Sequence, residues 1–165
     1  MHVVSDTSPL SCLASIQRLD LIDRQFGAVH IPPAVKAEVL RHPNPFAREV
    51  LKNAFASGRI IETTDVDLEP ISLLLRRTLD QGESEAISLA VNSGSELMLI
   101  DEREGREVAR RLGLRLTGTL GILMRAKLDG SLTSLKDVIN ELQINHAFSL
   151  APALVERALR EVGEN

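Results

Sequence analysis

Short apolar runs alternate with amphipathic patterns along the whole chain. The apolar runs are typical of strands in a buried sheet and occupy residues 2–4, 29–31, 60–61, 97–100 and 114–116. Amphipathic patterns predict helices that begin at Ser8, Pro33, Pro45, Leu68, Ser84 and just after Ile100, with further helices filling the C-terminal part. This alternation predicts an α/β fold, a parallel sheet of about five strands covered by helices on both faces.

The end of the first predicted strand carries the first candidate functional residue. Ser8 followed by Pro9 is typical of a helix start, with Ser8 as N-cap and proline at the first helical position. Asp6 is then not needed as a cap. An aspartate at the end of a buried strand is costly unless something uses its charge, so Asp6 is a functional candidate.

Three further acids are expected near Asp6. Asp101 directly follows the fourth predicted strand, and right-handed crossovers bring the carboxyl ends of parallel strands to one edge of a sheet. Glu38 lies on the helix after the second strand, and Glu85 lies at the start of the helix that leads into the fourth strand. Glu83 is a rival of Glu85, because helical residues two apart do not share a face.

Each of these further acids also has a structural explanation, whereas Asp6 is the hardest to explain in this way because Ser8 is the expected cap. Asp101 can cap the helix that follows it, Glu83 and Glu85 suit a first helical turn, and Glu38 can pair with Arg41 or His42. The joint placement of the acids favours a functional interpretation. Clustered carboxylates repel one another unless a cation neutralises them, and Mg²⁺ or Mn²⁺ held by oxygen ligands can drive phosphodiester hydrolysis.

Composition and charge restrict the possible classes of protein. The chain has 165 residues, 44% of them hydrophobic, and no apolar run long enough for a membrane span, so we expect one domain over 1–165 and no membrane partner. A single cysteine, Cys12, excludes an internal disulfide and favours a reducing, cytoplasmic location. The net charge of −4, with four Phe and no Trp or Tyr, leaves phosphates as the main point of contact for any nucleic acid.

Five arginines follow the fourth predicted strand, in the segment DEREGREVARRLGLR. Their spacing allows pairs such as Glu102–Arg106 and Glu107–Arg111, which are typical of a solvated helix. Arg103 and Arg106 begin beside Asp101, however, and are candidates to hold a substrate phosphate near the metal.

Five motifs in order resemble the PIN-domain superfamily, and in particular the PIN-like nucleic-acid-binding proteins of prokaryotes. They are DTSPL, PAVKAEV, GESEAISLA, LMLIDEREGREVARRLGL and TGTLGILMRAK, and the similarity covers nearly the whole chain. The resemblance implies a three-layer α/β/α sandwich and three or four acids that hold Mg²⁺ or Mn²⁺. Position by position, it assigns catalytic and metal-binding roles to Asp6, Glu38, Glu85 and Asp101. It also places Ser8 as the small hydroxyl residue near the first acid, a candidate to contact the substrate.

The same resemblance implies a function and partners. Many members are ribonucleases that act on single-stranded RNA, and many are toxins held inactive by an antitoxin. A homodimer is also expected, with residues 71–75 and 120–123 as candidate apolar surfaces.

Two other functions remain open. A non-catalytic PIN-like module would bind RNA or a protein without using the acids. A phosphatase of the haloacid-dehalogenase type would need a second aspartate two residues after Asp6, where this chain has Ser8.

Overall fold

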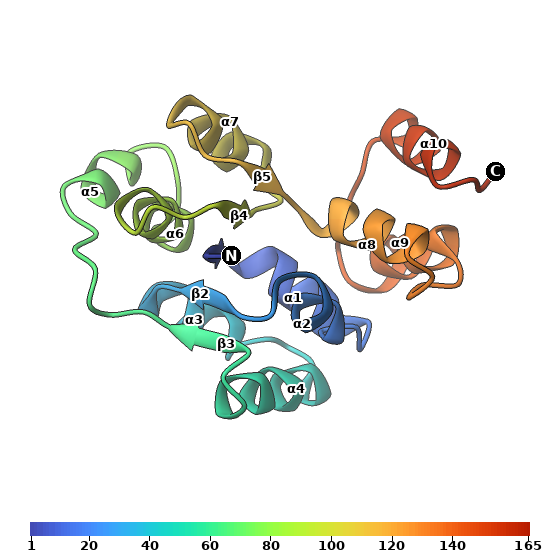
Figure 1. The fold of residues 1–165 in the computed structure, drawn as a ribbon, viewed down its shortest axis with the longest axis horizontal. Coiled ribbons are helices and arrows are strands. Elements are labelled where there is room, and N and C mark those ends of the chain that lie inside the picture. Colours follow the sequence, from blue (N-terminus) through green and yellow to red (C-terminus); the bar gives the residue numbers. More distant parts are fainter. The chain divides into compact units, whose positions relative to one another are not determined.

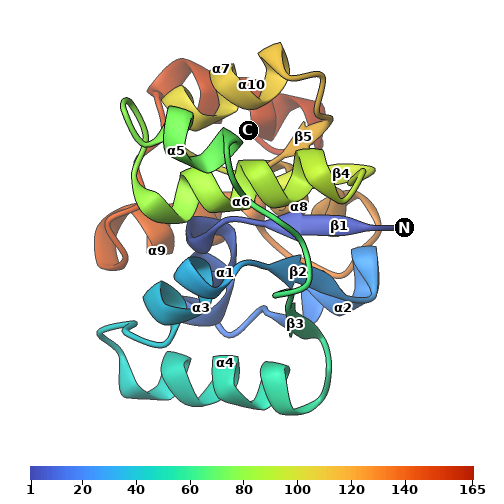
Figure 2. The same ribbon diagram turned by 90° about the vertical axis from the view of Figure 1, so that its left-hand side faces the viewer.

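A five-stranded, all-parallel sheet organises the first part of the chain. The computed structural model describes residues 1–165 and divides into two compact units, residues 1–119 and 120–165. The strands of the first unit are β1 (Val3–Ser5), β2 (Val29–Ile31), β3 (Ile60–Glu62), β4 (Leu97–Leu99) and β5 (Leu116–Thr117). Figures 1 and 2 show their spatial order, β3-β2-β1-β4-β5. All four strand pairs are parallel, which confirms the predicted α/β class.

Helices flank the sheet of the first unit. They are α1 (Thr7–Ser15), α2 (Asp20–Phe26), α3 (Pro33–Val39), α4 (Pro45–Ala56), α5 (Ile71–Leu75), α6 (Gln81–Asn92) and α7 (Arg103–Arg111). Figure 1 shows α1 on one side of the strands and α6 on the other. The inner strands β1, β2 and β4 are largely buried, with Val4, Ile31 and Leu99 at 0% exposure, because helices cover both faces of the sheet. The three-layer α/β/α arrangement is therefore confirmed.

The second unit consists of helices. α8 (Thr119–Leu128) leads into it and is followed by α9 (Leu135–Asn145) and α10 (Pro152–Glu161). Ser134 caps α9, and the Glu164 carboxylate accepts hydrogen bonds from the first two amides of that helix, at 2.7 and 3.0 Å. Ile122 and Leu123 are buried, so the stretch 120–123 offers little apolar surface to a partner.

Several predicted boundaries are wrong in detail. The helix predicted from Leu68 begins only at Ile71, because Pro70 restricts the backbone of the residue before it. The helix predicted from Ser84 begins three residues earlier, at Gln81, where Asp80 and Glu83 form a capping box. Helix α2 was not predicted. The single-domain prediction over residues 1–165 stays a prediction.

Candidate active site

The carboxyl ends of β1 and β4 meet at the centre of the sheet. These strands are neighbours in register Ser5↔Leu99, and the Asp6 amide donates to the Leu99 carbonyl at 2.9 Å. The chain runs outward from β1 towards β3 on one side and from β4 towards β5 on the other. This reversal of strand order is the point at which open parallel sheets bind ligands, and Asp6 and Asp101 flank it.

Asp6 is almost completely buried, at 3% exposure, and its side chain caps no helix. The prediction that Ser8 caps α1 is wrong: the helix begins at Thr7, and Asp6 occupies the N-cap position without a side-chain cap bond. The pKa of Asp6 is raised to about 8, chiefly by burial; the Thr7 amide acts to lower it, and the charges of Glu83, Asp80 and Glu38 add to the increase. Asp6 is therefore under the influence of other carboxylates and forms no ion pair with a basic side chain.

Glu38 approaches this centre from α3. The Thr7 hydroxyl donates a hydrogen bond to Glu38 Oε2, and a Cβ atom at Gly82 would lie 2.3 Å from Glu38 Oε1. Only glycine at position 82 therefore admits the observed Glu38 carboxylate. The neighbouring start of α6 carries Asp80, whose Oδ1 accepts from the Glu83 amide at 2.8 Å.

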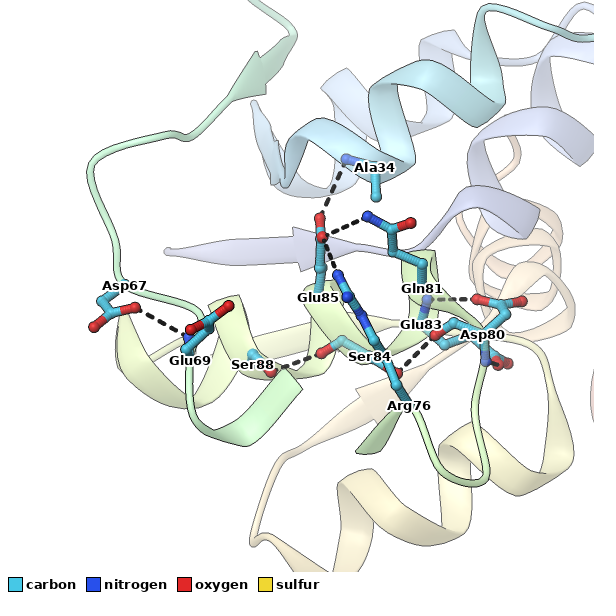
Figure 3. A network of polar contacts seen from close by, with 10 residues as sticks. All are labelled: Ala34, Asp67, Glu69, Arg76, Asp80, Gln81, Glu83, Ser84, Glu85 and Ser88. Carbon is cyan, nitrogen blue, oxygen red and sulfur yellow. Dashed lines mark hydrogen bonds and ion pairs between the residues drawn. The ribbon is translucent and has the colours of Figure 1, made fainter. Parts of the chain in front are cut away.

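Glu83 and Glu85 point to different surroundings, as the helical spacing predicts. Burial raises the pKa of Glu83, with added repulsion from Asp80, and a Cβ at Gly105 would lie 3.2 Å from Glu83 Oε1. The Glu85 carboxylate instead points towards the amide of Ala34, which donates to Oε2 at 3.3 Å (Figure 3).

The other Glu85 oxygen is already engaged. Arg76 and Gln81 donate to Glu85 Oε1 at 3.1 and 3.0 Å. Glu83, Asp80 and Glu38 are the acids that raise the pKa of Asp6, and Glu85 is not among them. Of the two rivals, Glu83 is therefore the one whose charge acts on Asp6.

Asp101 is fixed by hydroxyl groups from two other elements. Ser8 of α1 donates to Asp101 Oδ2 at 2.8 Å, and Thr119 donates to the same oxygen at 2.7 Å. The Thr119 amide donates to Oδ1 at 2.7 Å. The N-cap of α7 is Glu102, so Asp101 does not cap the helix that follows it. Thr119 lies 18 residues away in sequence, which is why no local pattern revealed its role.

Glycines at three positions make room for the acids, at Gly82 for Glu38, at Gly105 for Glu83 and at Gly118 for Asp101. No three histidine, cysteine, aspartate or glutamate side chains form a group that could hold a metal ion. Mg²⁺ commonly takes one or two carboxylates directly and completes its shell with water and substrate phosphate. An all-oxygen donor set around a buried aspartate therefore fits a hydrated divalent ion better than a closed metal cage.

The arginines of α7 do not form the expected pairs. Neither Glu102–Arg106 nor Glu107–Arg111 appears among the ion pairs of the structure. Arg106 Nη1 donates instead to the Ile100 carbonyl at 2.6 Å, one residue before Asp101. The Arg106 guanidinium is therefore held at the backbone just after β4, next to Asp101 in sequence.

A family model described as "PIN domain" matches residues 2–164. The chain belongs to the PIN-domain family. The match spans nearly the whole chain and confirms the resemblance of its motifs. No curated protein matches the chain. Membership in the PIN-domain family points to nuclease-type function and to binding of nucleic acid. No helix is long and apolar enough to cross a membrane.

A second polar region of the PIN domain lies at the opposite end of β1. A cavity of about 460 Å³ is lined there by His2, His30, Thr63, Asp65 and Ser93, among others. The two imidazole rings lie 4.5 Å apart, centre to centre. Burial and the neighbouring His2 ring lower the pKa of His30, partly offset by Asp65.

His30→Gln is expected to change how stability depends on pH. Because the folded pKa of His30 lies below 6.5, the neutral ring stabilises the fold above that pH, and this stability is lost as the pH falls through the folded pKa. Urea unfolding of wild type and variant at a series of pH values measures the effect. The advantage of wild type should shrink below pH 6.5, and a difference independent of pH would contradict the prediction.

Proposed function

We propose that this PIN-domain protein is a metal-dependent ribonuclease that uses Mg²⁺ or Mn²⁺ and cleaves single-stranded RNA. The observation that carries the proposal is the burial of Asp6 at the switch point of the sheet, where the charges of three other carboxylates act to raise its pKa. Such a cluster weakens a fold when it stands alone, since buried like charges repel and lose their hydration. A divalent cation converts this repulsion into a binding site.

The proposed ligand set is Asp6, Glu38, Glu83 and Asp101, some of them acting through bound water. We assign the third role to Glu83 and not to Glu85, because Arg76 already neutralises Glu85 at 3.1 Å. When bound, the ion supplies an activated water and stabilises the attacking and leaving oxygens of the phosphodiester. Thr7, Ser8 and Thr119 then act as positioning residues that aim Glu38 and Asp101.

Calorimetric titration with Mn²⁺ tests the assignment, using Glu83→Gln and Asp101→Asn with Glu85→Gln as the matched control. We expect Glu83→Gln and Asp101→Asn to weaken binding by about tenfold or more, as loss of a carboxylate near a metal commonly does. Glu85→Gln should bind as wild type does. Equal losses for the two glutamine variants would contradict the choice of Glu83, and no Mn²⁺ binding by wild type would contradict the metal site itself.

The second candidate function is a non-catalytic module that binds nucleic acid. One observation favours it: the Asp101 carboxylate already accepts hydrogen bonds from Ser8 and from both donors of Thr119. A carboxylate that accepts this many hydrogen bonds can stabilise the fold without taking part in metal binding. Wild type that binds RNA but neither binds Mn²⁺ nor cleaves would support this candidate.

The proposal extends to the protein partners that the resemblance implies, an antitoxin and a second copy of the chain. Leu73 and Leu74 of α5 are 49% and 61% exposed and offer an apolar contact. Light scattering of the purified protein distinguishes a monomer from a homodimer. Co-expression of this protein with the product of a neighbouring gene tests whether that product binds it as an antitoxin.

A further inference from the structure

Three arginines of α7 lie along one side of the helix. Arg103, Arg106 and Arg110 follow the spacing i, i+3, i+7, and we call them the arginine row. Arg111, one position beyond Arg110, is turned about 100° away around the helix axis. None of these four arginines has an ion pair with a carboxylate. The positive charges of Arg103 and Arg110 are therefore exposed on the helix without a close carboxylate partner.

The row begins at the candidate active site. Arg106 Nη1 binds the Ile100 carbonyl, and a Cβ at Gly118 would lie 3.2 Å from that nitrogen and 2.6 Å from Asp101 Oδ1. The absence of a side chain at Gly118 thus lets the guanidinium and the Asp101 carboxylate approach the same stretch of backbone. From Arg103 to Arg110 the row extends about 10 Å along the helix axis.

Arg106 and Arg110, two neighbouring members of the row, repel each other. Burial lowers the pKa of Arg106, the charge of Arg110 lowers it further, and Asp101 acts in the opposite direction. Like charges held close without a bridging carboxylate destabilise a helix slightly, and an anion placed between them removes that cost. Arginine is suited to phosphate because its planar guanidinium can donate two parallel hydrogen bonds.

We propose that the arginine row binds backbone phosphates of single-stranded RNA next to the phosphate that is cleaved. This inference rests on the proposed ribonuclease function and names the part of the surface that holds its substrate. With four phenylalanines and no tryptophan or tyrosine, the chain has little aromatic surface for base stacking, so phosphate contacts carry the binding. Arg110 is the decisive member, since it is exposed and forms no ion pair with a carboxylate.

Fluorescence anisotropy of a labelled oligouridine in EDTA tests the row without cleavage. Arg110→Gln is compared with Arg111→Gln, a matched control on the same helix with similar exposure. We expect Arg110→Gln to weaken binding about fivefold and to reduce the slope of log K against log salt by about 0.7, the value for one single-strand phosphate contact. Arg111→Gln should change neither quantity.

The outcomes separate this inference from the ribonuclease proposal. Suppose that wild type cleaves RNA with Mn²⁺ while the two variants bind the oligouridine equally well. The inference about the arginine row is then wrong, and the ribonuclease proposal stands. If only Arg110→Gln weakens RNA binding but wild type neither binds Mn²⁺ nor cleaves, the inference about the arginine row stands and the ribonuclease proposal fails. Failure of wild type to bind the oligouridine in EDTA would contradict the inference that the arginine row binds RNA.

Discussion

Asp6→Asn is expected to stabilise the metal-free protein while abolishing its metal binding. The pKa of Asp6 is raised from 3.8 to about 8 in the fold, chiefly by burial. A raised carboxyl pKa stabilises the fold fully below pH 3.8, and this contribution is lost as the pH rises through the folded pKa. At pH 7 the cost is on the order of 4 kcal/mol, and asparagine, which has the same shape without the proton equilibrium, avoids it.

Urea unfolding in EDTA and in Mn²⁺ measures this prediction. In EDTA at pH 7 the variant should unfold at higher urea than wild type, and its stability should vary less between pH 4 and pH 8. Added Mn²⁺ should stabilise wild type, because a ligand that binds only the folded state shifts the unfolding equilibrium, and should leave the variant unchanged. Addition of metal is therefore expected to narrow or reverse the difference in stability between the two proteins.

A matched control is Asp23→Asn, which removes an exposed carboxylate from α2. It should change the response to neither pH nor Mn²⁺. Lower stability of Asp6→Asn in EDTA would show that the buried carboxylate supports the fold. Equal stabilisation of wild type and Asp6→Asn by Mn²⁺ would show that Asp6 is not a ligand.

The sequence was sufficient to predict the sheet and its edge. Buried strands of a parallel sheet are nearly all apolar, so β1, β2 and β4 were found to within a residue or so. Strand direction then placed Asp6 and Asp101 together, because parallel strands end on the same side. Those inferences need only local pattern and general topology.

Contacts between distant segments could not be predicted. The serine–proline pattern predicted a cap at Ser8, yet its hydroxyl is used by Asp101, 93 residues away. Helical periodicity predicted that Glu83 and Glu85 lie on different faces of α6, but it could not show which of them faces the site. That choice depends on Arg76 and on the Ala34 amide, which tertiary structure brings to Glu85.

Gly82→Ala and Gly118→Ala are expected to weaken Mn²⁺ binding about tenfold while changing stability in opposite directions. At Gly82, the atoms that a Cβ meets all belong to the end of the flexible Glu38 side chain, with Oε1 at 2.3 Å. The carboxylate can swing away, and alanine within α6 then gains about 0.5–1 kcal/mol of helix propensity. At Gly118 the Cβ also meets the Ile100 backbone carbonyl at 3.0 Å, which cannot swing away, so overpacking should cost about 1–3 kcal/mol.

The comparison separates a glycine that seats a ligand from a glycine that the fold requires. Urea unfolding in EDTA gives the stabilities, calorimetry gives the Mn²⁺ affinities, and Gln81→Ala serves as a control beside Gly82 on the exposed side of α6. Unchanged Mn²⁺ affinity in Gly82→Ala would remove Glu38 from the ligand set. Because stability should rise in that variant, a loss of metal binding there cannot be a consequence of unfolding, and it would trace directly to the displaced carboxylate.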